Sequence, residues 1–384
     1  MATGPSMKQR AGSRAAGILV SLAAIVVTLL ITEAVFRFTH AFGARLSWSE
    51  PDPTIGYRFT PGRPYWNFSE NDHAVEGRIN SFGWRDRPRT IEKPPGAYRV
   101  AFLGDSFVEA FQVESDSTFV ALAEDRLTAR LGRTVEIMNF GRSGATQTDE
   151  YLVLQSDVMR FSPDLVAVLF NPGNDIDDVS RGTTDRLRPF YELTPDGDLL
   201  LDTSFNVGRG YRVRAAINDL KQRSALISLL TERYNIFQRA RRAREATPLQ
   251  EGLPRRLSLC TSDPDSIFVR NYRLNKVLIR EMADYCRERG VRFLLVCGDT
   301  VYEPERIRET AALDPTFDPG FFEVDLAELA DSLGVGYLGL QTPFREHAGA
   351  GGGSLHWSHY NYDGHRVVAR VLSNKLAEII SEGA

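Results

Sequence analysis

The chain has 384 residues, 42% of them hydrophobic and 25% charged, which is the composition of a folded globular protein. Its formal net charge of −4 argues against a nucleic-acid partner, because a surface that binds nucleic acid is basic. The three cysteines, Cys260, Cys286 and Cys297, have no zinc-binding spacing, and an odd number excludes a fully paired disulfide framework. We expect core thiols, with one bridge at most.

The N-terminus predicts a membrane anchor. Lys8, Arg10 and Arg14 precede residues 15–32, which carry no charge, and a helix over residues 15–38 can cross a hydrocarbon core of about 30 Å. A cleaved signal peptide is the alternative, but no A-x-A-like site follows the apolar run. The positive charges predict a cytoplasmic tail at residues 1–14 and an extracytoplasmic remainder, periplasmic in a Gram-negative cell. Glu33 and Arg37, four residues apart, are expected to pair.

Residues 39–95 are rich in Pro, Gly and aromatic residues and show little periodicity. This composition predicts an irregular spacer with turns. Its many aromatic residues predict that it packs on the domain that follows rather than hanging free.

From residue 96 onwards, apolar strand patterns alternate with amphipathic helix patterns. Strands are predicted at 99–106, 134–141, 163–175, 291–298 and 335–340, and helices at 117–132, 148–162, 275–290, 324–334 and 364–380. Gly132 is expected to end the first of these helices. The alternation predicts a doubly wound α/β domain over residues 96–384, with a parallel sheet that binds ligands beyond the C-terminal ends of its strands.

The alternation is interrupted at residues 178–262. A hairpin turning at residues 195–197 is predicted first, and one or two amphipathic helices come after it at 211–245. From Arg209 to Arg244 there are ten Lys or Arg residues against two acidic ones. A solvated helical face is one interpretation of this charge; a lid-like insertion that also touches anionic headgroups or an anionic polymer is the other.

Polar residues follow three of the predicted strands, and a histidine cluster lies near the C-terminus. Ser106 ends the strand at 99–106, Gly144 follows the second strand, and Asn174 follows the third. Residues 356–365 read HWSHYNYDGH. A serine becomes nucleophilic when an imidazole can take its proton, and the oxyanion formed at an acyl carbon needs N–H donors. The backbone amides of Ser106 and Gly144 and the side-chain amide of Asn174 can supply them.

These motifs, LGDSF, NFGRSG, PDLVAVLFNPGND and HYNYDGHRVVA, resemble those of the SGNH (or GDSL-like) hydrolases over residues 96–384. The apolar span with IGYRFTPG and INSFGWRDRP is similar to the lead-in of membrane-anchored bacterial members. The resemblance implies a flavodoxin-like three-layer α/β/α fold and acyl-ester chemistry without metal or organic cofactor. By position it makes Ser106 the nucleophile, Gly144 and Asn174 oxyanion donors, and His359 the general base.

The acid that would orient the imidazole is not evident. Family members commonly read Asp-x-x-His, but here His356 stands three residues before His359. The acid could come from elsewhere, or a backbone carbonyl could hold the imidazole. An Asp-x-His pair of Asp363 and His365 is a third possibility, as in alginate O-acetylation proteins of related fold. We favour His359, since residues 364–380 read as the closing helix. Asp105 is expected to bond backbone amides in the turn.

This site is compatible with three functions. The first is a membrane-anchored serine esterase that removes acyl groups, above all acetyl groups, from glycans or small esters. The second is an O-acyltransferase that passes the same group to a surface polysaccharide. The third is a catalytically silent glycan-binding module that has lost its acid.

Overall fold

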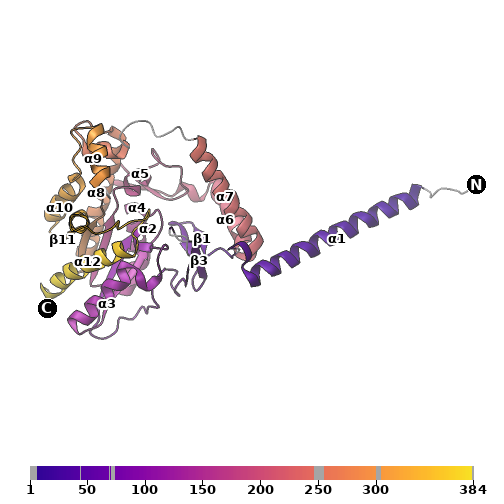
Figure 1. The fold of residues 1–384 in the computed structure, drawn as a ribbon, viewed down its shortest axis with the longest axis horizontal. Coiled ribbons are helices and arrows are strands. Elements are labelled where there is room, and N and C mark those ends of the chain that lie inside the picture. Colours follow the sequence, from indigo (N-terminus) through magenta and orange to yellow (C-terminus); the bar gives the residue numbers. More distant parts are fainter. Residues whose placement is uncertain are drawn as a thin grey trace, which may run out of the picture. The chain divides into compact units, whose positions relative to one another are not determined.

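The computed structural model describes residues 7–43, 45–68, 70, 74–245, 255–299 and 304–382 (Figure 1). The chain divides into two compact units, one formed by Met1–Ser47 with Val213–Pro248 and the other by Trp48–Arg212 with Leu249–Ala384. The predicted spacer is therefore divided at Ser47. Residues up to Ser47 join the first unit because they bond to its helices: the Ser47 amide donates to the carbonyl of Lys221 at 3.2 Å.

The first unit is helical. Its elements are α1 (Met7–Thr39), the greater part of α6 (Arg209–Arg223) and α7 (Ala225–Glu245). Within α1, residues Ala16–Thr39 have a mean hydropathy of 2.5 and are long and apolar enough to cross a membrane, a property that a signal sequence shares. The predicted pair is confirmed, with Arg37 Nε 2.6 Å from Glu33 Oε1.

The second unit is built on a parallel sheet. Its strands are β5 (Tyr98–Gly104), β6 (Val135–Gly141), β7 (Leu165–Phe170), β10 (Arg292–Cys297) and β11 (Gly336–Gly339). They lie in the order β11-β10-β7-β5-β6, and every neighbouring pair is parallel. In chain order this is 2-1-3-4-5, the flavodoxin-like arrangement, so the predicted doubly wound fold is confirmed.

Helices cover both faces of this sheet. One core joins alternate strand residues, such as Val100 and Phe102, to α3 (Phe119–Leu131), α11 (Gln341–Gly349) and α12 (Tyr362–Glu382). The intervening residues, such as Ala101 and Leu103, join α4 (Gln147–Val153), α8 (Ser266–Arg287) and α10 (Phe321–Leu333) in a second core. A buried sheet between two helical layers is the predicted three-layer sandwich.

Several boundaries differ from the predicted ones. Helix α8 begins at Ser266, well before residue 275, because Asp265 caps it by accepting a hydrogen bond from the Ile267 amide at 3.0 Å. Gly132 ends α3 in the left-handed conformation, as predicted. The prediction missed α11 and three further helices: α2 (Ser106–Glu109), α5 (Asn174–Asp178) and α9 (Pro304–Leu313).

The segment after Ser47 is more regular than predicted. It forms two antiparallel hairpins from β1 (Ser49–Asp52), β2 (Gly56–Phe59), β3 (Pro64–Phe68) and β4 (Ala74–Arg78). Its aromatic residues form a small core of their own with Phe111 from the domain. Arg85, itself buried, donates to the Tyr65 hydroxyl at 3.0 Å and to the Glu109 carbonyl at 2.7 Å. These contacts attach the hairpins to the turn after β5.

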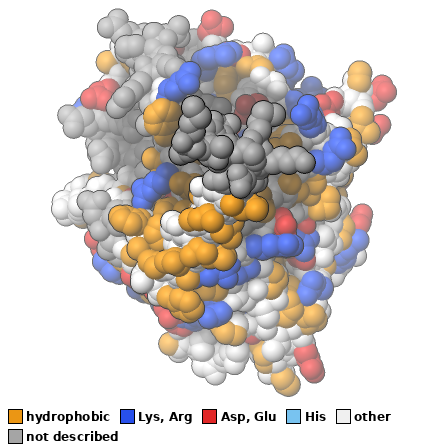
Figure 2. Space-filling model, turned by 90° about the vertical axis from the view of Figure 1, so that its right-hand side faces the viewer, with side chains coloured by type: hydrophobic (Ala, Val, Ile, Leu, Met, Phe, Trp, Pro, Cys, Tyr) orange, Lys and Arg blue, Asp and Glu red, His pale blue; other side chains and the backbone are white. Residues whose placement is uncertain are grey.

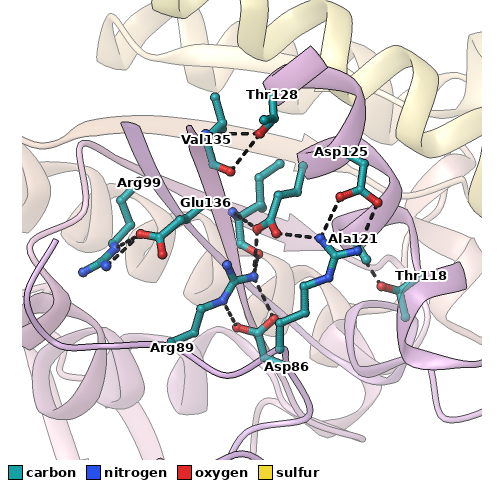
Figure 3. A network of polar contacts seen from close by, with 12 residues as sticks. Asp86, Arg89, Arg99, Thr118, Ala121, Asp125, Thr128, Val135 and Glu136 are labelled. Atoms are coloured by element: carbon teal, nitrogen blue, oxygen red, sulfur yellow. Dashed lines mark hydrogen bonds and ion pairs between the residues drawn. The ribbon is translucent and has the colours of Figure 1, made fainter. Parts of the chain in front are cut away.

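A network of ion pairs attaches the end of the same segment to α3 and β6 (Figure 3). Arg89 pairs with Asp86 and with Glu124, each at 2.8 Å. The Glu124 carboxylate also accepts a hydrogen bond from the Ile137 amide at 2.6 Å, so it joins α3, β6 and the segment that precedes β5.

The interrupting segment begins with the predicted hairpin, formed by β8 (Phe190–Leu193) and β9 (Leu199–Asp202) in the second unit. The predicted helices at 211–245 are α6 and α7. A lid formed by this insertion stays a prediction. Cys260, Cys286 and Cys297 are buried free thiols, as expected.

Candidate active site

Ser106 lies where β5 ends and α2 begins. Asp105 caps this short helix: its carboxylate accepts from the Phe107 amide at 2.9 Å and from Asn171 Nδ2 at 2.8 Å. A Cβ atom at Gly104 would stand 2.3 Å from Cγ2 of Val108, so only glycine lets the helix fold back this closely over the strand. The strand therefore stops on Gly-Asp-Ser to present a half-buried serine at the C-terminal edge of the sheet.

His359 reaches this serine from the loop before α12. Its Nε2 lies 2.8 Å from Ser106 Oγ, and its ring packs 4.9 Å from the ring of Phe107 between centroids. The imidazole is largely buried, with 28% of the side chain exposed. The two residues are far apart in sequence, and the structure brings them together.

The carboxylate that faces His359 is Glu70, which the sequence analysis did not identify. Glu70 Oε1 lies 2.6 Å from His359 Nδ1, on the opposite side of the ring from Ser106. The carboxylate also accepts from the amides of Ser358 and His359, both at 3.0 Å, and from Ser358 Oγ at 2.5 Å. Burial alone would raise the Glu70 pKa, but the hydrogen bonds from His359 and Ser358 outweigh it and lower this pKa to about 2.

Glu70 stands between β3 and β4, inside the segment that was predicted as a spacer. The sequence around it, NFSENDH, offers several polar residues and no spacing that singles out one acid. Position 356, where an acid was expected, holds a histidine that contacts another carboxylate, Asp299, at 3.1 Å.

The other two strand ends bond to each other and to the serine turn. Asn174 Nδ2 donates to the carbonyl of Ala145 in the loop after β6, at 2.9 Å, and makes a longer 3.3 Å contact with Asp175 Oδ1. Asn171, also from the loop after β7, bonds to Asp105. The residues predicted as oxyanion donors therefore belong to one set of interlocked loops.

Two buried arginines support the loop that carries Gly144. Arg188 Nη1 donates to the Gly144 carbonyl at 2.6 Å, and Arg142 Nη1 donates to the Ile55 carbonyl at 2.7 Å. Both guanidinium groups pair with Asp149. Gly144 has φ +68°, a left-handed conformation that favours glycine.

The carboxyl groups beneath the serine turn have raised pKa values. Burial raises the pKa of Glu109 to about 8, and it raises the pKa values of Asp105 and Asp175 above their usual range. Among the described residues, no group of three or more His, Cys, Asp or Glu side chains is arranged to hold a metal ion.

The alternative residues lie away from Ser106 Oγ. His365 is buried inside α12, where its Nδ1 accepts from the Phe119 amide at 3.1 Å, and burial lowers its pKa to about 3. Asp363 is an exposed partner of Arg366 at 2.5 Å, so the Asp-x-His pairing is not present. Asp105 bonds a backbone amide as predicted, together with the Asn171 side chain.

Comparison with known proteins gives matches only among solved structures. No family model and no curated protein matches the sequence. TesA is 13% identical, with 73% of this chain and 98% of that chain covered at a TM-score of 0.37. A variant of Axe2, an acetyl xylan esterase from Geobacillus stearothermophilus, is 13% identical, with 72% and 94% covered at 0.39. A GDSL-like lipase from Bacteroides thetaiotaomicron is 12% identical, with 73% and 88% covered at 0.33. The chemistry assigned to this site rests on the contacts of the chain itself.

Proposed function

We propose that the chain is a serine esterase of the SGNH type that cleaves acyl esters through an acyl-enzyme on Ser106. One observation carries the proposal: an unbroken line of hydrogen bonds from Glu70 through His359 to Ser106, with lengths of 2.6 and 2.8 Å. A carboxylate, an imidazole and a hydroxyl in this sequence are the parts that turn a serine into a nucleophile.

In the first half of the reaction, Ser106 Oγ attacks the acyl carbon and its proton passes to His359 Nε2. The imidazolium that forms is stabilised by Glu70, which is ionised at neutral pH and accepts the hydrogen on Nδ1. The ester C–O bond then breaks, the leaving alkoxide takes the proton from His359, and the acyl group remains on Ser106.

In the second half, His359 removes a proton from water, and the resulting hydroxide attacks the acyl carbon. The bond to Ser106 Oγ breaks, and the proton returns to the serine. A sugar hydroxyl in place of water would make the same chemistry an acyl transfer, which is the alternative that the sequence raised.

The oxyanion of each tetrahedral intermediate needs donors that are already in place. We assign this role to the backbone amides of Ser106 and Gly144 and to Asn174 Nδ2. The support is indirect. Arg188 holds the Gly144 loop, and Asn174 Nδ2 donates one hydrogen to the Ala145 carbonyl; its other hydrogen makes only a 3.3 Å contact with Asp175 and is the one that we assign to the oxyanion. Acetyl esters, on glycans or small molecules, are the proposed substrates.

The proposed location is the outer face of a cell membrane, with α1 as a single-pass anchor. Lys8, Arg10 and Arg14 before the apolar run favour a cytoplasmic N-terminus. Alkaline phosphatase fused after residue 95 should be active. An inactive fusion, or full-length protein in the soluble fraction, would contradict the anchor.

The esterase proposal is tested by turnover of a short-chain aryl acetate. Ser106→Ala should abolish hydrolysis and leave the circular dichroism spectrum unchanged, because only the attacking oxygen is lost. Ser332→Ala is the control, since it removes a serine hydroxyl on α10 that donates to the Leu329 carbonyl. A Ser106→Ala protein with near wild-type turnover would reject Ser106 as nucleophile.

A further inference from the structure

Helix α7 is attached to the end of the apolar run of α1. The Glu33 carboxylate accepts from the amides of Ala225 and Leu226, at 2.9 and 3.1 Å, and from Ser224 Oγ at 2.7 Å. These are the first amides of α7, which have no partner inside their own helix. A carboxylate there also complements the positive end of the helix dipole.

Further contacts within this unit hold the same junction. Phe36 and Leu46 pack against Ala225 and Leu229, and Arg233 donates to the Phe42 carbonyl at 3.0 Å. From this junction α7 runs away from α1 rather than alongside it (Figure 1).

The depth of the junction follows from the length of α1. Residues Ala16–Thr39 form 24 residues of helix, roughly 36 Å at about 1.5 Å per residue, which exceeds a hydrocarbon core of about 30 Å. If α1 spans the membrane, Glu33 lies in its last turns, close to the headgroups. The beginning of α7 then lies at the same level.

The face of α7 opposite the junction is apolar and exposed. Leu230, Tyr234 and Phe237 follow each other at helical spacing and are 60%, 60% and 62% exposed. The buried residues Ala225, Ser228 and Leu229 lie on the other side of the helix. Helix α6 repeats the pattern with exposed Val213, Ile217 and Leu220. The sequence allowed α6 and α7 to expose an ordinary polar face to solvent. Such a face would not gather large apolar side chains in this way.

The charge on α7 is strongly positive. Residues 225–245 contain five arginines, at positions 233, 239, 241, 242 and 244, against two acids, Glu232 and Glu245. Figure 2 faces the side on which α1 lies in Figure 1, and the apolar side chains gathered in this view are bordered by Lys and Arg side chains. An apolar stripe on an arginine-rich helix is the pattern of a helix that lies in a membrane interface with anionic headgroups.

We propose that α7 lies in the interface of the membrane that α1 enters, with Leu230, Tyr234 and Phe237 among the acyl chains and its arginines on anionic headgroups. The occupant of this face is lipid because Glu33 ties the helix to the bilayer boundary. This inference rests on the proposed anchor and is independent of the esterase chemistry.

The test is the depth of spin labels on the full-length chain in nanodiscs that hold one copy each. Labels are placed on Leu230→Cys, Tyr234→Cys and Phe237→Cys, with Asn235→Cys as the matched control on another face of the same helix. The native thiols are buried, so the unsubstituted chain is the blank. In phosphatidylcholine with phosphatidylglycerol, the three stripe labels should collide more with oxygen than with a water-soluble nickel chelate, and Asn235→Cys should show the reverse.

A label on Ile25→Cys in α1 tests the membrane anchor separately from the interfacial position of α7. Lipid exposure at residue 25 with water exposure at 230, 234 and 237 would overturn the interfacial helix and leave the anchor standing. Water exposure at all positions would overturn both. Equal depth of the stripe labels with and without phosphatidylglycerol would overturn the contribution assigned to the arginines.

Discussion

Two histidines of the loop before α12 each face a carboxylate, and they differ in what lies on the other side of the ring. His356 contacts Asp299 at 3.1 Å, and both side chains are almost fully buried. His359 contacts Glu70 at 2.6 Å, and its second nitrogen meets Ser106. A contact between a histidine and a carboxylate is therefore not enough to identify a catalytic base. The distance to a nucleophile, and partial access to substrate, distinguish the two.

The pair at His356 makes further contacts inside the loop. Asp299 also accepts from the Tyr360 hydroxyl at 3.1 Å, and the His356 ring packs 5.3 Å from the ring of Phe344 between centroids. These contacts fix the loop from the inside and leave His359 on its outer side. Substitutions at the two pairs should therefore separate catalysis from stability, and the largest effect is expected at His359.

His359→Ala should reduce kcat by as much as Ser106→Ala, on the order of 10⁴–10⁶, because serine and imidazole act as one unit. The double variant should lose little more. His356→Ala is the control and should keep most of its activity once it is folded. Steady-state turnover of an aryl acetate measures all four proteins, and a larger loss for His356→Ala than for His359→Ala would reverse the assignment.

Glu70→Gln should reduce kcat by about 10²–10⁴, since an amide cannot stabilise the imidazolium as a carboxylate does. Asp299→Asn should instead leave kcat nearly unchanged and lower the free energy of unfolding, by about 1–3 kcal/mol for a disturbed buried hydrogen bond. Turnover and urea unfolding measure the two effects. Full activity in Glu70→Gln would mean that the imidazole is oriented without its carboxylate.

Asn174→Ala should reduce kcat by about 10²–10³ with little change in KM, because an oxyanion donor acts on the transition state and not on the bound ester. Asn171→Ala gives a useful contrast, as this neighbour bonds to Asp105 and should act mainly on stability. A loss confined to KM would make Asn174 a substrate-binding residue.

The smallest effect concerns pH. The Glu70 pKa is lowered from 4.5 to about 2 in the folded state, so its ionised form stabilises the fold above pH 4.5. This contribution is lost as the pH falls from about 4.5 towards 2, and it is on the order of 1 kcal/mol after allowance for solvent screening. Urea unfolding of wild type and Glu70→Gln across this range should show a difference that disappears at the acid end; a constant difference would contradict the assigned pKa.

The position of Ser106 at a strand end and the fold were accessible from sequence because their signals are local. Buried strands alternate with amphipathic helices, and Ser106, Gly144 and Asn174 each lie just beyond the end of a strand. Parallel strands bring such positions to one edge of the sheet. His359 could be favoured over His365 because the periodicity of α12 includes the latter.

Glu70 was not accessible because nothing local marks it. It stands 289 residues from His359 in the chain, and its position depends on the β3–β4 hairpin and on how Arg85 and Phe111 attach that hairpin to the domain. The split at Ser47 and the attachment of α7 to Glu33 likewise depend on contacts between distant segments.

The most direct test of the central claim is the site at which a fluorophosphonate probe reacts with the full-length protein in detergent. Peptide mapping by mass spectrometry should find one adduct, on Ser106, which disappears in Ser106→Ala and forms far more slowly in His359→Ala and Glu70→Gln. No adduct on the wild type, or an adduct on another side chain, would contradict the claim that Glu70, His359 and Ser106 form a nucleophilic site.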